Sequence, residues 1–194
     1  MLLDFPLPEG CSLRTTDVHE EDQIITVGIS SRCHTSACPD CGTPSGRVHS
    51  SYERHPADLP VSGHSVRLRV TARRFFCDHD ICARTTFAER MPGFLQPYAR
   101  RTDRLGQQQL WVGFVVGGKA GSRLLALLAM RVSGDPLLRM IRRAPEPYVP
   151  TPRILGIDDW AKRKGRDYGT ILVDLEARQP VDMLPEATSE AVAT

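Results

Sequence analysis

Alternating apolar and polar positions predict β-strands in the first half of the chain. The clearest run is residues 64–76, in which Val66 and Leu68 alternate with arginines. Residues 23–30, which are rich in β-branched side chains, and residues 46–54 are two further strand candidates. Prolines and glycine between the last two runs mark a turn. The pattern therefore predicts a β-rich region over residues 1–92.

The pattern changes to a helical one after Pro92 and Gly93. Residues 96–116 and 117–130 are each predicted to form a helix, and a Gly-Gly break separates them. A short turn then leads to a third, basic helix that ends before Pro145. We therefore expect three helices over residues 93–144.

The third predicted helix is amphipathic. Ser133 or Asp135 is suited to cap its start, and Pro136 fits the first helical position. At 100° per residue, one side collects apolar residues and the other collects arginines. The apolar side comprises Leu137, Leu138, Met140 and Ile141, and the basic side comprises Arg139, Arg142 and Arg143.

Prolines between residues 145 and 152 predict a stiff, extended linker. Two apolar strands follow, at residues 153–158 and 168–175, with a basic loop between them. The chain is therefore predicted to be a multi-module α+β protein. Its expected parts are a β-rich module (1–92), a three-helix module (93–144), the linker (145–152) and a two-strand C-terminal part (153–194).

Charge is distributed unevenly although the net charge of the 194 residues is only +2. Residues 94–143 carry nine Lys or Arg against two acids, a local charge of +7, whereas residues 1–35 carry a charge of −4. A basic helical block is typical of proteins that bind nucleic acid. It is also what an ordinary helical bundle with a solvated arginine face has, and charge alone leaves both interpretations open.

Three short helices with a tight turn before a basic last helix match a helix-turn-helix, in which that last helix enters the major groove of duplex DNA. Arginines on such a module supply phosphate and base contacts. The predicted DNA-binding residues are Arg100, Arg101, Arg104, Arg123, Arg139, Arg142 and Arg143.

The sequence predicts a cytoplasmic protein with no membrane partner. The first ten residues contain an early acid and two prolines, unlike an export signal. The longest apolar stretches are too short and too interrupted to cross a bilayer. Disulfides are rare in the cytoplasm, where paired cysteines more often bind metal.

Two cysteine pairs predict a structural zinc site. Cys38 and Cys41 flank two residues, and Cys77 and Cys82 flank four. Four thiolates form the tetrahedral shell that structural zinc prefers, and such a closed shell leaves no position for substrate. The 35 residues between the pairs exceed the spacing of about 15–20 in compact zinc motifs. A hairpin of the two intervening strands would bring the pairs together.

The same cysteines are compatible with three alternatives. A redox Cys-x-x-Cys motif usually opens a helix in a β-α-β unit, and no such pattern surrounds Cys38. A disulfide framework does not fit a chain without an export signal. His79 could replace one cysteine as a ligand. Structural zinc bound by four cysteines is the favoured prediction.

Several stretches resemble the ISL3 family of insertion-sequence transposases. Residues 38–60 and 73–89 are similar to the zinc-binding domain of that family. Residues 101–145 are similar to its helix-turn-helix, and residues 154–185, which contain "GIDDW", to the opening of its catalytic domain. The resemblance extends over almost the whole chain from about residue 24.

This resemblance implies an RNase H-like catalytic domain. In the family, three carboxylates hold two divalent ions, Mg²⁺ or Mn²⁺, that act on DNA phosphodiesters. Asp158 matches the first of these carboxylates, and Asp174 matches none of the three. Family members continue for about one further domain that carries the second Asp and the Glu. We therefore expect a two-strand stub of the catalytic domain and a chain that is inactive as an enzyme.

The expected function is that of a transposase fragment that binds double-stranded DNA, at the terminal inverted repeats of its element, without cutting or joining it. The full-length transposase, or a second copy of the chain, is a further expected partner. Two other functions are compatible with the same residues. One is a DNA-binding repressor of transposition, and the other is a zinc-stabilised protein-interaction module.

Overall fold

The computed structural model describes residues 5, 7, 12–145, 150–163 and 165–186. The chain divides into two compact units, residues 1–144 and residues 145–194. Four residues of the predicted linker, 146–149, lie outside the described ranges. No helix in these ranges is long and apolar enough to cross a membrane. The cytoplasmic location stays a prediction.

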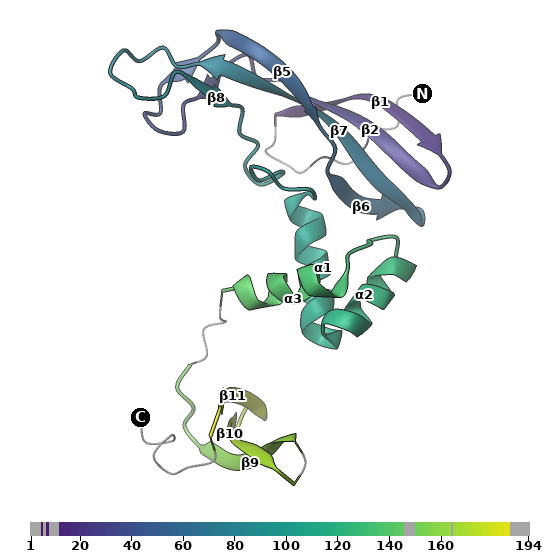
Figure 1. Cartoon of the computed structure of the whole chain (residues 1–194), viewed down its shortest axis with the longest axis vertical. Helices are drawn as coiled ribbons and strands as arrows, with labels where there is room; N and C mark the ends of the chain where they lie inside the picture. Colours follow the sequence, from purple (N-terminus) through teal and green to yellow (C-terminus); the bar gives the residue numbers. More distant parts are fainter. Residues whose placement is uncertain (1–4, 6, 8–11, 146–149, 164, 187–194) are drawn as a thin grey trace. The chain divides into compact units, whose positions relative to one another are not determined.

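One long strand, β7 (His64–Phe76), organises the sheet of the first unit (Figure 1). It pairs in parallel with β2 (Ile24–Ser31), which in turn pairs with β1 (Leu13–Glu21). On its other side it pairs antiparallel with β5 (Val48–Arg54) and β6 (Ala57–Val61). The short β8 (Thr86–Ala88) also pairs with β7.

The core of this sheet comes from the alternation that predicts β7. Leu68 and Val70 are fully buried, and so is Val27 of the parallel partner β2. Phe94 and Leu95, which follow the sheet in sequence, pack into the same cluster. The predicted domain boundary at residue 92 thus lies inside the first compact unit.

Two polar strands of this sheet, β1 and β6, are not predicted from the sequence. β1 carries acids and a histidine along most of its length, and β6 contains Pro60. Neither shows the apolar alternation on which strand prediction depends. Both form because a neighbouring strand supplies hydrogen-bond partners, which is a property of the tertiary structure.

Three helices complete the first unit: α1 (Asp103–Val116), α2 (Gly118–Leu127) and α3 (Gly134–Arg143). The first begins seven residues later than predicted, since residues 96–99 form a turn instead. Thr102 caps α1, and its hydroxyl accepts from the backbone N–H of Leu105 at 3.3 Å. Ser133 is the N-cap residue of α3, although its side chain makes no cap hydrogen bond.

Glycines let α3 pack closely against the other two helices. An added Cβ at Gly113 of α1 would lie 3.0 Å from Leu137, and one at Gly121 of α2 would lie 2.9 Å from the same side chain. Leu137 is fully buried as a result. The apolar side of α3 therefore packs directly against glycines of α1 and α2, while the arginines of α3 stay exposed.

A buried polar junction joins the strands to the helices. Asp58 of β6 is 2% exposed and accepts hydrogen bonds from Thr102 Oγ1 at 2.6 Å and from Arg104 Nε at 2.8 Å. The hydroxyl of Thr102 thereby serves both the helix cap and the strand carboxylate. The backbone N–H of Ala57 also donates to the carbonyl of Arg100 at 2.9 Å.

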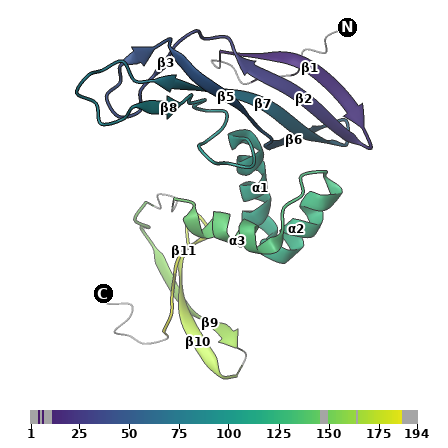
Figure 2. The ribbon, with the colours of Figure 1, turned by 45° about the horizontal axis from the view of Figure 1, so that its top comes forward.

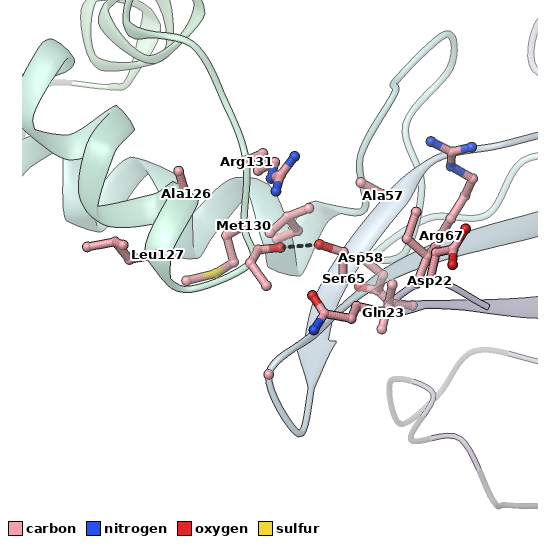
Figure 3. A pocket seen from close by; sticks show the side chains of 15 residues that line it. Asp22, Gln23, Ala57, Asp58, Ser65, Arg67, Ala126, Leu127, Met130 and Arg131 are labelled. Carbon is pink, nitrogen blue, oxygen red and sulfur yellow. Dashed lines mark hydrogen bonds between the residues drawn. The ribbon is translucent and has the colours of Figure 1, made fainter. Parts of the chain in front are cut away.

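A groove lies beside this junction, between the strand turns and the end of α2 (Figure 3). Ser65 of β7 crosses it and donates to the carbonyl of Ala129 at 3.1 Å. Arg67 and Arg131 line it together with Asp22. The groove contains side chains of both charges, and the hydrogen bond between Ser65 and Ala129 spans it. We therefore treat the groove as part of the strand–helix junction.

The second unit is a three-stranded antiparallel sheet in the order β11-β10-β9. Its strands are β9 (Leu155–Arg163), β10 (Asp167–Asp174) and β11 (Gln179–Leu184). The prediction of a two-strand stub is therefore wrong. Pro180 obscures β11 in the sequence because proline breaks a ladder; in the fold it lies beside a bulge, where proline is tolerated.

Apolar side chains of the second unit remain largely accessible. Leu155, Ile157, Leu175 and Met183 are between 44% and 56% exposed. A sheet of only three strands buries little apolar surface among its own residues. The described residues of this unit therefore form a small sheet with few buried apolar side chains.

Candidate metal centre and nucleic-acid interface

The first cysteine pair lies in a tight turn between two very short strands, β3 (Ser36–Ala37) and β4 (Pro44–Ser45). The backbone N–H of Gly42 donates to the carbonyl of Cys38 at 2.9 Å. Gly42 has a φ of 73°, which glycine adopts without strain. This turn directs the side chains of Cys38 and Cys41 to the same side.

The second pair occupies the connection between β7 and β8 (Figure 2). Cys77 follows the last residue of β7, and its backbone N–H donates to the carbonyl of Thr85 at 2.9 Å. Cys82 lies on the returning segment, where its N–H donates to the carbonyl of His79 at 3.0 Å. Because β8 pairs with β7, the turn is closed at its base.

The two turns bring all four predicted cysteines together. Their sulfur atoms lie within 4.8 Å of one another, and Cys41 and Cys77 are 3.6 Å apart. Sulfurs at the corners of a zinc tetrahedron with bonds of about 2.3 Å are separated by about 3.8 Å. The donor set and its size therefore fit structural zinc. In the described part of the chain this is the one cluster of three or more candidate ligands, and His79 is outside it.

A small aromatic core supports the metal centre. Cys38 is 2% exposed and packs with Phe75 and Phe87, which are fully buried and stack at 5.9 Å between ring centroids. The other three cysteines are more accessible. The centre thus lies at the end of the sheet, against the side chains of β7 and β8.

The thiols influence one another strongly. Hydrogen bonds from the side chain and backbone of Thr43 lower the pKa of Cys41 to about 6. At Cys77 the backbone N–H of His79 favours the thiolate, but burial and the thiol of Cys41 outweigh it and raise the pKa to about 12. Four neighbouring thiolates repel one another. A divalent cation removes that repulsion, which is why such a cluster suits metal.

Two ion pairs flank the cluster, and the sequence pattern predicts neither. Arg84 Nε contacts Asp40 at 2.6 Å, which links the second cysteine turn to the first. Arg47 contacts Asp78 at 3.0 Å and lies over the ring of Phe76. Both pairs are surface-exposed, where solvent screens the attraction between the charges. No local sequence signal connects Arg84 with Asp40, which are 44 positions apart.

The predicted DNA-binding arginines fall into two groups. Arg104 binds the buried Asp58, and Arg101 donates to Gln109 and to the sulfur of Met140 at 3.1 Å. Burial lowers the pKa of the Arg101 guanidinium, although it remains a cation at neutral pH. Arg101 thereby links α1 with α3, and Arg104 links α1 with β6. The others are exposed: Arg100, Arg123, Arg139, Arg142 and Arg143.

Asp158 lies inside β9 and not at its end, because pairing with β10 extends the strand to Arg163. It is exposed and opposite Ile171. Asp174, opposite Leu155, is an odd number of positions from Ile171 and so faces the other side of the sheet. The described residues gather no carboxylate cluster around Asp158.

Residues 34–82, the segment that carries both cysteine turns, match the family model described as the zinc-finger of transposase IS204/IS1001/IS1096/IS1165. This segment is similar to the zinc ribbon of ISL3-family transposases. The zinc ribbon of this family accounts for the four-cysteine cluster.

A curated relative extends the likeness beyond the ISL3 zinc ribbon. The transposase for insertion sequence element IS1001 of Bordetella parapertussis is 30% identical over 153 residues, which cover 79% of this chain. The match spans 37% of the length of that relative. No solved structure matches the chain. The RNase H-like character of residues 153–194 therefore stays a prediction.

Proposed function

We propose that this chain binds double-stranded DNA through a helix-turn-helix formed by α2 and α3. The observation that carries the proposal is the position of Arg139, Arg142 and Arg143, which extend from an exposed side of α3. The opposite side of this helix is seated on Gly113 and Gly121. A helix held in this way presents a rigid basic surface, as major-groove recognition requires.

The zinc ribbon serves this function as a scaffold. Its four thiolates leave no open coordination position, so the metal stabilises the fold without acting on substrate. The sheet that holds the ribbon is joined to α1 through Asp58, Thr102 and Arg104. Metal binding at one end of the sheet thereby supports the element that bears the helices.

The curated relative is a transposase for an insertion sequence element, so the terminal inverted repeats of such an element are the proposed DNA target. Within the described residues Asp158 has no carboxylate partners for a two-metal site. We therefore expect binding without strand cleavage. Mg²⁺- or Mn²⁺-dependent cleavage by the purified chain that disappears in Asp158→Ala would overturn this expectation.

Fluorescence anisotropy with a labelled duplex tests the DNA-binding proposal. Each of Arg139→Ala, Arg142→Ala and Arg143→Ala is expected to weaken binding and to reduce the slope of log K against log salt by about 1. Arg67→Ala, which removes an exposed arginine from β7, is the matched control and should bind normally. Unchanged duplex binding in all three α3 variants would refute the proposal.

A second function, protein association, is favoured by an exposed apolar side of α1. Trp111, Phe114 and Val115 are 54%, 55% and 82% exposed at helical spacing. A second copy of the chain or a full-length transposase is the candidate partner. Sedimentation equilibrium distinguishes the functions, because a monomer that still binds duplex DNA would exclude self-association as a requirement.

A further inference from the structure

A basic groove of about 530 Å³ lies on the first unit, beside the paired strands β5, β7 and β8 and the turn that follows them. Its lining includes Arg74 and Arg90, which are exposed and have no ion-pair partner among the described residues. The acid in its lining, Glu89, is already paired with Arg73 at 2.6 Å. The groove therefore presents uncompensated positive charge.

Two exposed aromatic side chains line the same groove, Tyr52 at 41% and Tyr98 at 98% exposure. Tyr98 occupies the third position of a turn closed by the N–H of Ala99 and the carbonyl of Gln96, with Pro97 in the second position. Its φ is 60°, a conformation in which type II turns favour glycine. Neither burial nor backbone preference explains a tyrosine here.

The turn that carries Tyr98 is held in place by an arginine. Arg54 of β5 donates to the carbonyls of Gln96 and Ala99, each at 2.9 Å. These carbonyls flank Tyr98 on both sides. The backbone on both sides of Tyr98 is thus held at the rim of the groove by the strand module, so less of this turn has to be ordered on binding.

We propose that this groove binds a DNA strand with unpaired bases, next to the duplex bound by α3. The guanidinium groups of Arg74 and Arg90 contact phosphates, and the exposed ring of Tyr98 stacks on a base. Cations combined with accessible aromatic rings are the general means by which proteins hold single strands. The inference rests on the proposed DNA-binding function but uses a different surface, so each can fail separately.

Anisotropy titrations with a labelled single strand of about 15 nucleotides test the proposal, because single-strand sites span roughly 4–16 nucleotides. The variants are Tyr98→Gly, Tyr98→Phe and the double variant Arg74→Ala with Arg90→Ala. Arg67→Ala is the charge control, since it removes an exposed arginine from the same strand as Arg74. The full chain is used throughout, loaded with zinc, and thermal melting verifies that each variant is folded.

Tyr98→Gly is expected to weaken single-strand binding about tenfold, in line with the loss of one stacked base. Tyr98→Phe keeps the ring and should bind nearly as the wild type does. The double arginine variant should bind more weakly, and its salt slope should fall by about 0.7 for each phosphate that the protein no longer neutralises. Arg67→Ala should change neither quantity.

Wild-type affinity for the single strand in folded groove variants would overturn the proposal, as would equal losses in Tyr98→Phe and Tyr98→Gly. If polyglutamate displaced the labelled strand as well as unlabelled single-stranded DNA does, the groove would be a general polyanion site. Tighter binding of the same sequence as RNA would also contradict the proposal. A parallel titration with duplex DNA distinguishes duplex binding by α3 from single-strand binding by the groove. Groove variants should keep wild-type affinity for the duplex, whereas α3 variants should bind the duplex more weakly.

Discussion

Each thiol of the cysteine cluster is expected to contribute to the stability of the strand module. Cys38 is the most buried of the four candidate ligands and packs against Phe75 and Phe87. Its loss removes one corner of the four-coordinate zinc shell, and three protein ligands bind zinc more weakly than four. The metal and the aromatic core are therefore expected to be lost together.

Cys38→Ser should abolish binding of the one zinc ion expected per chain and markedly lower the thermal midpoint. Native mass spectrometry measures the metal, and circular dichroism measures the midpoint. Cys33→Ser is the control, because Cys33 is an exposed free thiol outside the cluster. Full zinc content in Cys38→Ser would contradict the assignment.

A second residue-scale prediction concerns pH. The hydroxyl of Thr16 and the guanidinium of Arg69, 2.6 Å away, hold the pKa of Asp17 below its ordinary value. A carboxylate with a depressed folded-state pKa stabilises the fold above its unfolded pKa of about 3.9, and this contribution is lost as the pH falls further.

Asp17→Asn should therefore lower the thermal midpoint at pH 7, and its difference from the wild type should shrink towards pH 3. Melting curves at several pH values measure the difference. Glu21→Gln, an exposed change on the same strand, should show no such trend. If the difference in thermal midpoint between Asp17→Asn and the wild type stayed the same at every pH, the Asp17 carboxylate would be excluded as the source of this pH-dependent stability.

Spacing predicts some site residues and misses others. The four cysteines are predictable because each pair occupies one local turn, and the structure brings the pairs together. Arg84 and Tyr98 are not, because their significance depends on neighbours distant in sequence: Asp40 for one and Arg54 for the other. Similarly, nothing local distinguishes the structural Arg104 from the exposed Arg123.

Among the elements, predictability follows apolar alternation. Strand β7 is predicted with its observed bounds, His64–Phe76, because its buried residues alternate regularly. β6 and β11, which contain proline, are not predicted. α3 is recognisable because proline and serine mark its start and its two sides differ in polarity. The two glycines against which α3 packs, Gly113 and Gly121, cannot be recognised from the sequence in the same way.

Gly121 is expected to allow the close packing of α3 against α2. Gly121→Val places a branched side chain against Leu137 and should destabilise the fold by about 1–3 kcal/mol. Ala120→Val introduces the same branched residue on the exposed side of α2 and should cost less than about 1 kcal/mol. Urea denaturation measures both changes.

Helix propensity alone predicts a gain of stability for Gly121→Val, because valine forms helices better than glycine, and a loss for Ala120→Val. A Gly121→Val variant that is as stable as the wild type would therefore contradict close packing of α3 on α2. If the packing is correct, Gly121→Val should also weaken duplex binding although it removes no charge.

The whole first unit depends on the junction at Asp58. Its carboxylate is buried and receives hydrogen bonds from both Thr102 and Arg104, so the strand and helical parts share one polar contact. Removing one member of a buried ion pair leaves the other without compensation, at a cost of about 3–5 kcal/mol.

Asp58→Ala should therefore destabilise strands and helices together. We expect a single unfolding transition for the first unit in the wild type, and a lower midpoint in the variant, by tryptophan fluorescence of Trp111 and by far-ultraviolet circular dichroism. Glu21→Ala, an exposed acid, should leave the midpoint unchanged. Helices that melt at the wild-type midpoint in Asp58→Ala would show that the junction does not couple the two parts.

The parallel pairing of β2 with β7 has a consequence during synthesis. Ile24 pairs with Ser65, which is 41 residues later in the chain. At about 5–20 residues per second, a ribosome needs roughly 2–8 s to supply the partner after β2 has emerged. For that interval the β1–β2 hairpin presents an open edge and an uncovered apolar side. The acids on β1, which make this strand hard to recognise, are expected to disfavour pairing of this hairpin with its copies on other nascent chains until β7 is made.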